Sequence, residues 1–262
     1  MSAKPYLSTV PARLTTATRG HTAVIDGTTS PTERDRIDEQ PRSDEHTVMI
    51  ERLVSLRTRR RTVYEFYIKP LADRVVAALL LALSLPVLAA TALVVRLALG
   101  SPVLFRQLRI GQDDRRFHMF KFRTMRPDRR RESCPDYRGP ERRVTHKSAD
   151  DPRHTRLGRM LRKASLDELP QLFNVLRGDM SLVGPRPELV EIVERYTAWQ
   201  HARHAVKPGI TGLWQVTERA NGRLMHECVE LDLTYIERLS LRADVAIAFR
   251  TPLALLRRDR VV

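Results

Sequence analysis

The feature that most constrains this chain is one long stretch without charge. From Val75 to Val95, 21 consecutive residues carry no charged side chain, and most of the stretch reads "LLLALSLPVLAATALVV". A continuous helix of that length extends about 30 Å, which matches the hydrocarbon thickness of a bilayer. Length and composition therefore predict a membrane-inserted helix, and they argue against the buried helix of a soluble domain.

Pro86 divides this stretch, and positive charge flanks it on both sides. Proline removes a backbone N–H and clashes with the preceding turn, so it kinks or breaks a helix. Each half then has about 11 residues and reaches about half of the bilayer. Because basic side chains prefer the cytoplasmic face, two basic flanks favour a re-entrant helix-break-helix over a kinked spanning helix, and both stay open. The flanking cations include "RTRRR", Lys69, Arg74, Arg96, Arg106 and Arg109.

The chain has a large excess of basic residues. Among 262 residues, 46 are Lys or Arg and 31 are Asp or Glu, for a net charge of +15. This indicates an anionic partner, which can be nucleic acid, a phosphorylated substrate or an acidic membrane surface. Cys134 and Cys228 occur without CxxC or Cys/His spacing, which predicts neither a disulfide framework nor a zinc site and fits a reducing compartment.

Composition divides the chain into four parts. Residues 1–46 lack the apolar core of a signal peptide and are rich in Thr, Ser, Asp and Arg. We expect a disordered polar tail there, with a regulatory or partner-binding tail as the alternative. Residues 47–68 are expected to form a basic amphipathic lead-in, residues 69–99 the re-entrant membrane segment, and residues 100–258 the main domain.

The segment "SLDELPQLFNVLRG" predicts the start of a helix that carries two adjacent carboxylates. Ser165 and Glu168 have capping-box spacing, and Pro170 and Gly178 are typical of a helix start and a helix end. Asp167 and Glu168 therefore stand at or just before a helix N-terminus. The simplest explanation of acids at this place is their favourable interaction with the helix dipole.

Two further segments supply cations. "GDMSLVGPRPE" places Arg186 between two prolines, in a loop able to hold a guanidinium in one pose for bidentate phosphate binding. "FHMFKFRTM" predicts a short strand that presents Lys121 and Arg123, or simply an edge strand with solvated charges. Carboxylates beside cations, near a lipid-embedded segment, indicate phosphoryl transfer to a membrane-bound acceptor.

At these residues the chain resembles the bacterial sugar transferase family, the monotopic phosphoglycosyl transferases that initiate exopolysaccharide and related glycan assembly. The resemblance covers about Tyr67 to Arg258. Its blocks, in the order of the family, are "SPVLFRQLRIG", "FKFRTM", "DDPRHTRLGRMLRKASLDELPQLFNVLRGDMSLVGPRPE", "KPGITGLWQV" and "ELDLTYIERLSLRADVAIAFRTPLALLRR". Several long blocks in this order are far more specific than any single motif.

The resemblance implies a reaction and a set of roles. The family transfers a sugar 1-phosphate from a nucleotide diphosphate sugar, usually a UDP-sugar, to polyprenyl phosphate and releases UMP. It implies that Asp167 is the nucleophile and forms a covalent aspartyl intermediate, and that Glu168 helps to bind Mg²⁺. Arg186 is implied to hold phosphate, and Lys121 and Arg123 are weaker candidates for nucleotide or phosphate contacts.

The resemblance also implies a fold and a location. We expect an α+β protein, predominantly helical, with a re-entrant membrane hairpin, a catalytic domain over residues 100–258 and in-plane amphipathic helices. The expected location is the cytoplasmic face of the bacterial inner membrane, against anionic lipids. Many members have a serine directly before the break proline, whereas here Leu85 precedes Pro86 and Ser84 lies one residue earlier.

Several points stay open at the level of sequence. Helices are expected from Leu224 to Leu239 and from Asp244 to Arg257, and Glu230 and Asp232 are weak candidates for metal or substrate binding. The competing interpretation is a basic membrane-anchored adaptor or nucleic-acid binder without catalysis, but no nucleic-acid-binding motif supports it, so we expect no nucleic-acid partner. A homodimer stays open, and no segment identifies the sugar.

Overall fold

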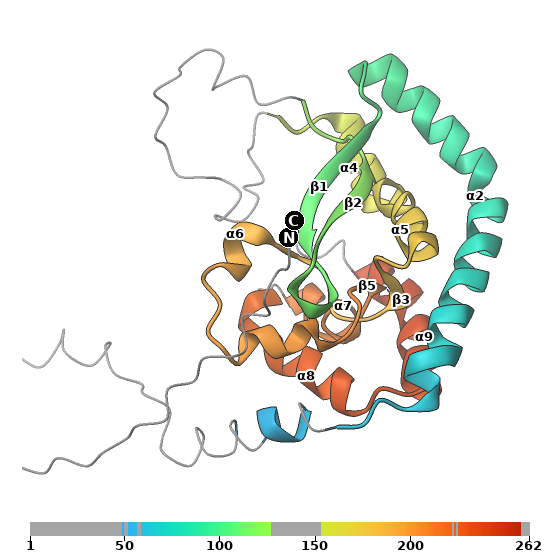
Figure 1. Ribbon diagram of the computed structural model, residues 1–262. Coiled ribbons are helices and arrows are strands. Elements are labelled where there is room, and N and C mark those ends of the chain that lie inside the picture. The colour runs from blue at the N-terminus through green and yellow to red at the C-terminus, as the bar shows by residue number, and fades with distance from the viewer. Residues whose placement is uncertain are drawn as a thin grey trace, which may run out of the picture. The chain divides into compact units, whose positions relative to one another are not determined.

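The computed structural model describes residues 49, 52–56, 59–126, 153–221, 223 and 225–257 (Figure 1). The expected polar tail, residues 1–46, lies outside the described residues, as does Cys134. The described residues combine helices with five short strands, and the helices predominate. This agrees with the expected mixed, mainly helical architecture.

The uncharged stretch belongs to a single helix, α2 (Lys69–Leu99), which continues from a short π-helix, η1 (Tyr64–Ile68). The expected break is not present, because α2 runs through Pro86 and curves along one side of the domain (Figure 1). The φ angle of proline suits a helix, and only the missing N–H and the ring disturb the preceding turn. Ser84 Oγ donates a 3.4 Å hydrogen bond to the Leu81 carbonyl in that turn.

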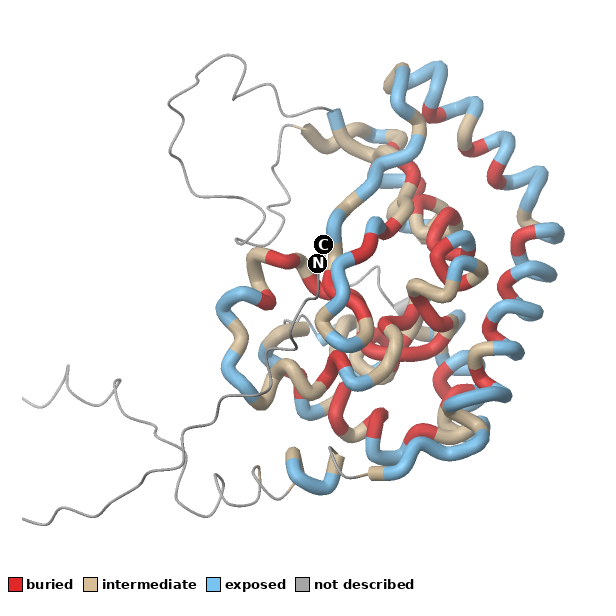
Figure 2. The backbone as a smooth tube through the Cα atoms, viewed as in Figure 1, coloured by how far each residue is buried: buried red, intermediate tan, exposed pale blue. Residues whose placement is uncertain are grey.

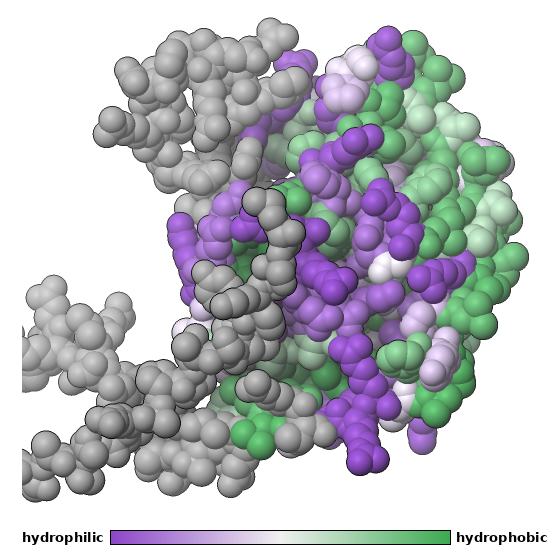
Figure 3. Space-filling view, viewed as in Figure 1, coloured by the Kyte–Doolittle hydropathy of each residue, from purple (hydrophilic) through white to green (hydrophobic). Residues whose placement is uncertain are grey.

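Helix α2 has one buried face and one exposed apolar face. Ala77, Leu81, Leu88 and Val95 are buried at spacings of four and seven residues, which is one stripe of a helix (Figure 2). The other face is apolar yet uncovered, and it forms the green band along α2 in Figure 3. Among the described residues, only the segment Tyr64–Leu99 is long and apolar enough to cross a membrane. The most exposed apolar residues of α2 are Leu71, Leu79, Leu83, Leu85, Leu93 and Leu97.

Both ends of α2 are bonded to the same folded domain. At its start, Lys69 Nζ lies 2.6 Å from Asp244 Oδ2 and donates a 3.0 Å hydrogen bond to the Val183 carbonyl. At its end, the Arg123 guanidinium donates to the Leu99 carbonyl and, at 2.7 Å, to the Gly100 carbonyl. The bonds from Arg123 satisfy carbonyl groups that the C-terminus of a helix leaves without partners.

The strands form two small sheets. Strand β1 (Leu104–Ile110) pairs antiparallel with β2 (Arg116–Phe122) and with β4 (Glu188–Leu189), in the order β2-β1-β4. Strands β3 (Ser181–Val183) and β5 (Gly209–Thr211) pair in parallel. The prediction of a strand in "FHMFKFRTM" is confirmed, and β2 is an edge strand whose Phe117, Met119 and Phe122 side chains enter the core.

Short helices surround these strands. A main core cluster joins α2, β2, α4 and α5, so the long apolar helix and the segments around the acidic pair share one core. The remaining helices are η2 (Gln112–Asp114), α4 (Arg156–Lys163), η3 (Leu166–Glu168), α5 (Gln171–Arg177), α6 (Val190–Val193), η4 (Gln200–Ala205), α7 (Leu213–Thr217), η5 (Arg219–Asn221), η6 (Met225–Glu227), α8 (Val229–Glu237) and α9 (Leu241–Arg257).

Three predicted helices differ from the structure in their bounds. The capping box at Ser165 is wrong, because Ser165 has a left-handed backbone with φ of 54° and makes no side-chain cap bond. Pro170 precedes α5 instead, and Gly178 ends it with φ of 83°, as predicted. The helix expected from Leu224 to Leu239 is divided into η6 and α8, whereas α9 begins at Leu241, three residues before the expected start.

Gly158 tests the packing of α4 against the end of β2. A Cβ atom at this position would lie 1.8 Å from the Thr124 carbonyl oxygen. Gly158→Ala is therefore expected to lower the free energy of unfolding by about 3 kcal/mol, measured by denaturant titration of the detergent-solubilised protein. Arg159→Ala, on the exposed side of the same helix, is the control. Equal stability of both variants would contradict this packing.

Candidate active site

Three segments far apart in the sequence bring the predicted carboxylates and cations together. Helix η3 carries Glu168, β2 carries Lys121, and the loop between β3 and β4 carries Arg186. Glu168 Oε1 lies 3.1 Å from Lys121 Nζ and 2.7 Å from an Arg186 guanidinium nitrogen. The side chains of Glu168 and Lys121 are each 13% exposed, so most of this charge is shielded from water.

The three charges keep one another ionised. Burial alone would raise the pKa of Glu168, but the charges of Arg186 and Lys121 outweigh burial and hold that pKa well below its usual range. Burial lowers the pKa of Lys121, and the carboxylate of Glu168 opposes this shift. The cluster therefore places one carboxylate between two basic side chains, which is an arrangement that favours a phosphate ligand.

Asp167 belongs to the same electrostatic group as Glu168. Its side chain is buried, with 7% of the residue exposed, and its negative charge acts on both Lys121 and Arg186. Successive side chains of a 3₁₀ turn are about 120° apart, so Asp167 and Glu168 face different directions.

The loop that carries Arg186 is held by its backbone. It begins at Gly184, where a Cβ atom would lie 2.5 Å from the Lys207 carbonyl oxygen, so this close approach requires glycine. Arg109 donates a 3.0 Å hydrogen bond to the Pro187 carbonyl. Arg203 donates a 3.0 Å hydrogen bond to the carbonyl of Arg186 itself. The pose of the Arg186 guanidinium therefore depends on residues of two other elements.

Arg203 and Arg109 were missed by sequence reasoning. Arg203 is 1% exposed, and its guanidinium lies 2.6 Å from Asp232 Oδ2. Asp232, a weak candidate for metal or substrate binding, is therefore the partner of a buried arginine, while Glu230 is exposed on α8. No spacing connects these positions, which come from β1, η4 and α8, so nothing in the sequence pattern marks them.

Arg123 does not join the cluster. The sequence groups it with Lys121 as a candidate phosphate contact, but its guanidinium bonds the carbonyl groups of Leu99, Gly100 and Ser101. Residues two apart in a strand point to the same face, so Arg123 would point the same way as Lys121 if β2 continued. Strand β2 ends at Phe122, and a local bend after it redirects the Arg123 side chain. Arg123 thus serves the end of α2, and Lys121 alone from this motif reaches Glu168.

A cavity of about 690 Å³ adjoins Glu168. Most of its lining is apolar and comes from α2, α5, α7 and α9, including Val76, Leu80, Leu83 and Val87 of α2. Among the described residues, Glu168 and Arg219 are the charged ones that line it, and Ser84 also lines it. An apolar chamber with charge at one place suits a ligand that has a long apolar part and an anionic head.

Comparison with known proteins identifies the family of this chain. The model of the family described as "Bacterial sugar transferase" matches residues 64–258, which include α2 and all of the cluster. The chain belongs to the bacterial sugar transferase family. It is therefore an enzyme of the transferase class, and the resemblance expected from the sequence blocks is confirmed.

Three relatives illustrate the similarity of this sugar transferase to curated proteins. "Galactosyl transferase CpsE" of Streptococcus agalactiae is 44% identical over 155 residues, 58% of this chain and 34% of that protein. "Uncharacterized sugar transferase EpsL" of Bacillus subtilis is 43% identical over 180 residues, 69% of this chain and 83% of that protein. The "UDP-glucose:undecaprenyl-phosphate glucose-1-phosphate transferase" of Caulobacter vibrioides is 44% identical over 198 residues, 73% of this chain and 70% of that protein. This chain thus spans most of two of these relatives but about one third of the first.

The acidic pair is the part of the site that suits Mg²⁺. This ion prefers oxygen ligands, and in phosphate-transferring sites it binds through one or two carboxylates together with water and substrate phosphate. Asp167 and Glu168 offer such oxygens within a mostly buried site, and two cations already balance part of their charge. The donor set therefore fits Mg²⁺, with Glu168 as the predicted ligand.

Glu168→Gln tests the charge balance of the cluster. The change leaves Lys121 and Arg186 without a carboxylate partner at Oε1, so we expect the free energy of unfolding to fall by about 3 kcal/mol. Because the pKa of Glu168 is lowered in the folded state, this difference should persist above pH 4.5. It should shrink only as the pH falls through the lower folded-state pKa of Glu168.

Glu194→Gln is the matched control for this measurement. Glu194 lies 3.7 Å from Arg116 in an exposed ion pair, which contributes about 0.5 kcal/mol or less. Denaturant titrations of both variants, from pH 8 to pH 4, give the comparison. If Glu168→Gln and Glu194→Gln lose the same amount of stability, Glu168 is not the centre of a buried charge cluster.

Proposed function

We propose that this bacterial sugar transferase transfers a sugar 1-phosphate from a UDP-sugar to membrane polyprenyl phosphate and releases UMP. The relative in Caulobacter vibrioides carries this reaction in its name, with glucose as the sugar and undecaprenyl phosphate as the acceptor. The reaction would be the first step of exopolysaccharide or related glycan assembly.

The observation that carries the proposal is the position of Glu168. It touches two cations and also lines the largely apolar cavity beside α2. A soluble nucleotide sugar brings phosphates to the cations, and a polyprenyl phosphate brings an apolar chain that suits the cavity. Both substrates can therefore reach one cluster, which a transfer between a soluble donor and a lipid acceptor requires.

The first step forms a covalent intermediate on Asp167. A carboxylate oxygen of Asp167 attacks the phosphorus that bears the sugar, and the bond between this phosphorus and the bridging oxygen of UMP breaks. UMP leaves with that oxygen, and an acyl phosphate links Asp167 to the sugar phosphate. Lys121 and Arg186 would stabilise the negative charge that develops on the phosphate oxygens.

The second step regenerates the carboxylate. A phosphate oxygen of polyprenyl phosphate attacks the same phosphorus, the acyl phosphate bond breaks, and polyprenyl diphosphate sugar forms. Mg²⁺ held by Glu168, with Asp167 beside it, would supply charge neutralisation of the substrate phosphates. The bonds from Arg203 and Arg109 keep the Arg186 loop in place, so this chain enters the reaction with its cations already positioned.

Asp167→Asn tests the covalent step. An amide is not a competent nucleophile here, so UMP release from a panel of UDP-sugars with Mg²⁺ and polyprenyl phosphate should fall on the order of 1,000-fold or more. Without acceptor, the wild type should release about one UMP per chain and gain the mass of one phosphosugar. Asp113→Asn, which changes an exposed aspartate, is the control. Turnover by Asp167→Asn would reassign the nucleophile, and no UMP release from any donor would reject the proposed function.

We further propose that α2, although it is unbroken at Pro86, is re-entrant in the sense that both of its ends lie at the cytoplasmic face of the inner membrane. Its two ends bond to one folded domain, through Lys69 and Asp244 at the start and Arg123 at the end. A spanning helix would place its ends on opposite sides of the bilayer, far from a domain on one side. Exposed apolar side chains of α9, Phe249, Leu253 and Leu256, would enter the same interface, where anionic lipids would meet the basic flanks of α2.

Cysteine labelling tests this topology. Phe66→Cys and Leu104→Cys, at exposed positions on either side of α2, are made after both native cysteines are replaced by alanine. A membrane-impermeant maleimide should label both in inside-out vesicles and neither in right-side-out vesicles. Arg223→Cys, at an exposed position of the domain, reports the side of the domain itself. Labelling of positions 66 and 104 from opposite sides would show that α2 spans the membrane.

A further inference from the structure

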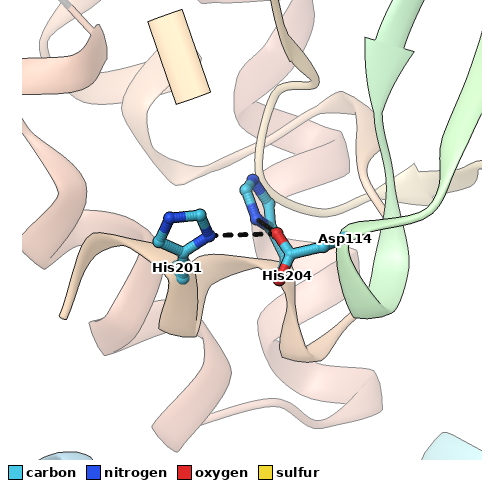
Figure 4. A group of neighbouring side chains, drawn as sticks. All are labelled: Asp114, His201 and His204. Carbon is cyan, nitrogen blue, oxygen red and sulfur yellow. Dashed lines mark hydrogen bonds and ion pairs between the residues drawn. The ribbon is translucent and has the colours of Figure 1, made fainter. Parts of the chain in front are cut away.

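A second cluster of ligating side chains lies away from the acidic pair. Asp114 of η2 accepts contacts from two imidazoles of η4 at the same oxygen: His201 Nδ1 is 3.1 Å and His204 Nδ1 is 2.6 Å from Asp114 Oδ1 (Figure 4). The three ligand atoms lie within 4.8 Å of one another, and no other such group occurs among the described residues.

Local backbone structure explains why these side chains converge. His201 and His204 are three residues apart, and in a 3₁₀-helix such as η4 side chains at this spacing lie directly above one another. Asp114 has φ of 56°, a left-handed conformation that aspartate adopts more readily than most residues. Gln112 donates a 3.0 Å hydrogen bond to the Ala205 carbonyl and so ties η2 to η4.

We propose that Asp114, His201 and His204 bind one divalent transition-metal ion, for which zinc is the natural probe. Two imidazole nitrogens and one carboxylate oxygen are a ligand set that zinc accepts, with water in a fourth position. The set differs from the acidic pair, where oxygen ligands alone suit Mg²⁺. The two sites are therefore distinguishable by the metal that they prefer.

The distances and the exposure suit a metal site. Zinc with ligand bonds of about 2.0 to 2.2 Å places tetrahedral ligand atoms about 3.3 Å apart, which small side-chain shifts would reach from the present separations. The side chain of His201 is 32% exposed and that of His204 is 7% exposed, so solvent reaches one side only. Nε2 of His204 has no hydrogen-bond partner in the described part of the chain, so whatever binds Nδ1 determines the tautomer.

The metal would crosslink the turn between β1 and β2, which carries Asp114, to η4, which carries the two histidines. Arg203 lies between the two histidines in sequence, and its guanidinium bonds both the Arg186 carbonyl and the Tyr196 hydroxyl oxygen. Tyr196 also stacks on the His204 ring, with centroids 6.1 Å apart. An ion bound to both histidines would therefore hold the segment that positions the Arg186 loop. This role is structural and is independent of the proposed reaction.

Zinc binding is tested on the full-length protein without a histidine tag, after removal of metal by chelation. A competition titration against a chromophoric chelator measures zinc affinity for the wild type, Asp114→Asn and His201→Gln. We expect each variant to lose about 100-fold or more in affinity at this site. His118→Gln removes an exposed histidine of β2 and is the matched control, with affinity unchanged.

Two further measurements separate ligation from misfolding. His201 is partly exposed, so its variant should keep the wild-type circular dichroism spectrum and melting temperature without zinc. Saturating zinc should raise the melting temperature of the wild type and of His118→Gln but not of His201→Gln. Cobalt in place of zinc should give the visible bands of a four-coordinate nitrogen and oxygen site. Equal zinc affinity of His201→Gln and wild type, or no saturable binding by the wild type, would overturn the proposal.

Discussion

Glu168 contacts two cations that lie 47 residues before it and 18 residues after it in the chain. This one carboxylate joins η3, the edge strand β2 and the loop between β3 and β4. Burial would make each charge costly in isolation, and the mutual attraction offsets that cost only while all three are in place. The geometry of the candidate active site therefore depends on a charge cluster that must form as a unit. The buried bonds from Arg203 and Arg109 hold the Arg186 loop of this cluster in place.

The segment that carries Lys121 also connects the site to the long apolar helix α2. In "KFRT", Lys121 bonds Glu168 while Arg123 caps the end of α2, so four residues serve both the charge cluster and the apolar helix. The cavity continues this connection, because α2 forms part of its wall and its charged lining includes Glu168. A shift of α2 would thus change the chamber beside Glu168.

Particular residues show how far sequence reasoning reached. The blocks that resemble the family pointed to Glu168, Arg186 and Lys121, and the structure brings these three together. Ser165 and Pro86 are less well predicted, because local rules describe an isolated helix end or break, whereas in the folded chain Ser165 is left-handed and α2 is continuous. Arg203 and the histidine cluster with Asp114 were not predicted, since their partners are separated by up to 90 residues.

The sequence by itself determined the chemistry that is available: an uncharged membrane-length helix, an acidic pair, a rigid arginine loop and a family. Periodicity and composition are properties of a few consecutive turns, so they can be recognised in the sequence without knowledge of the fold. Only the tertiary structure decided the assignments. In the folded chain Lys121 bonds Glu168, whereas Arg123 bonds the end of α2. Asp232 pairs with Arg203. His201 and His204 converge on Asp114. The physical reason is that a buried charge takes the partner that packing brings within about 3 Å, and sequence distance places no limit on which partner that is.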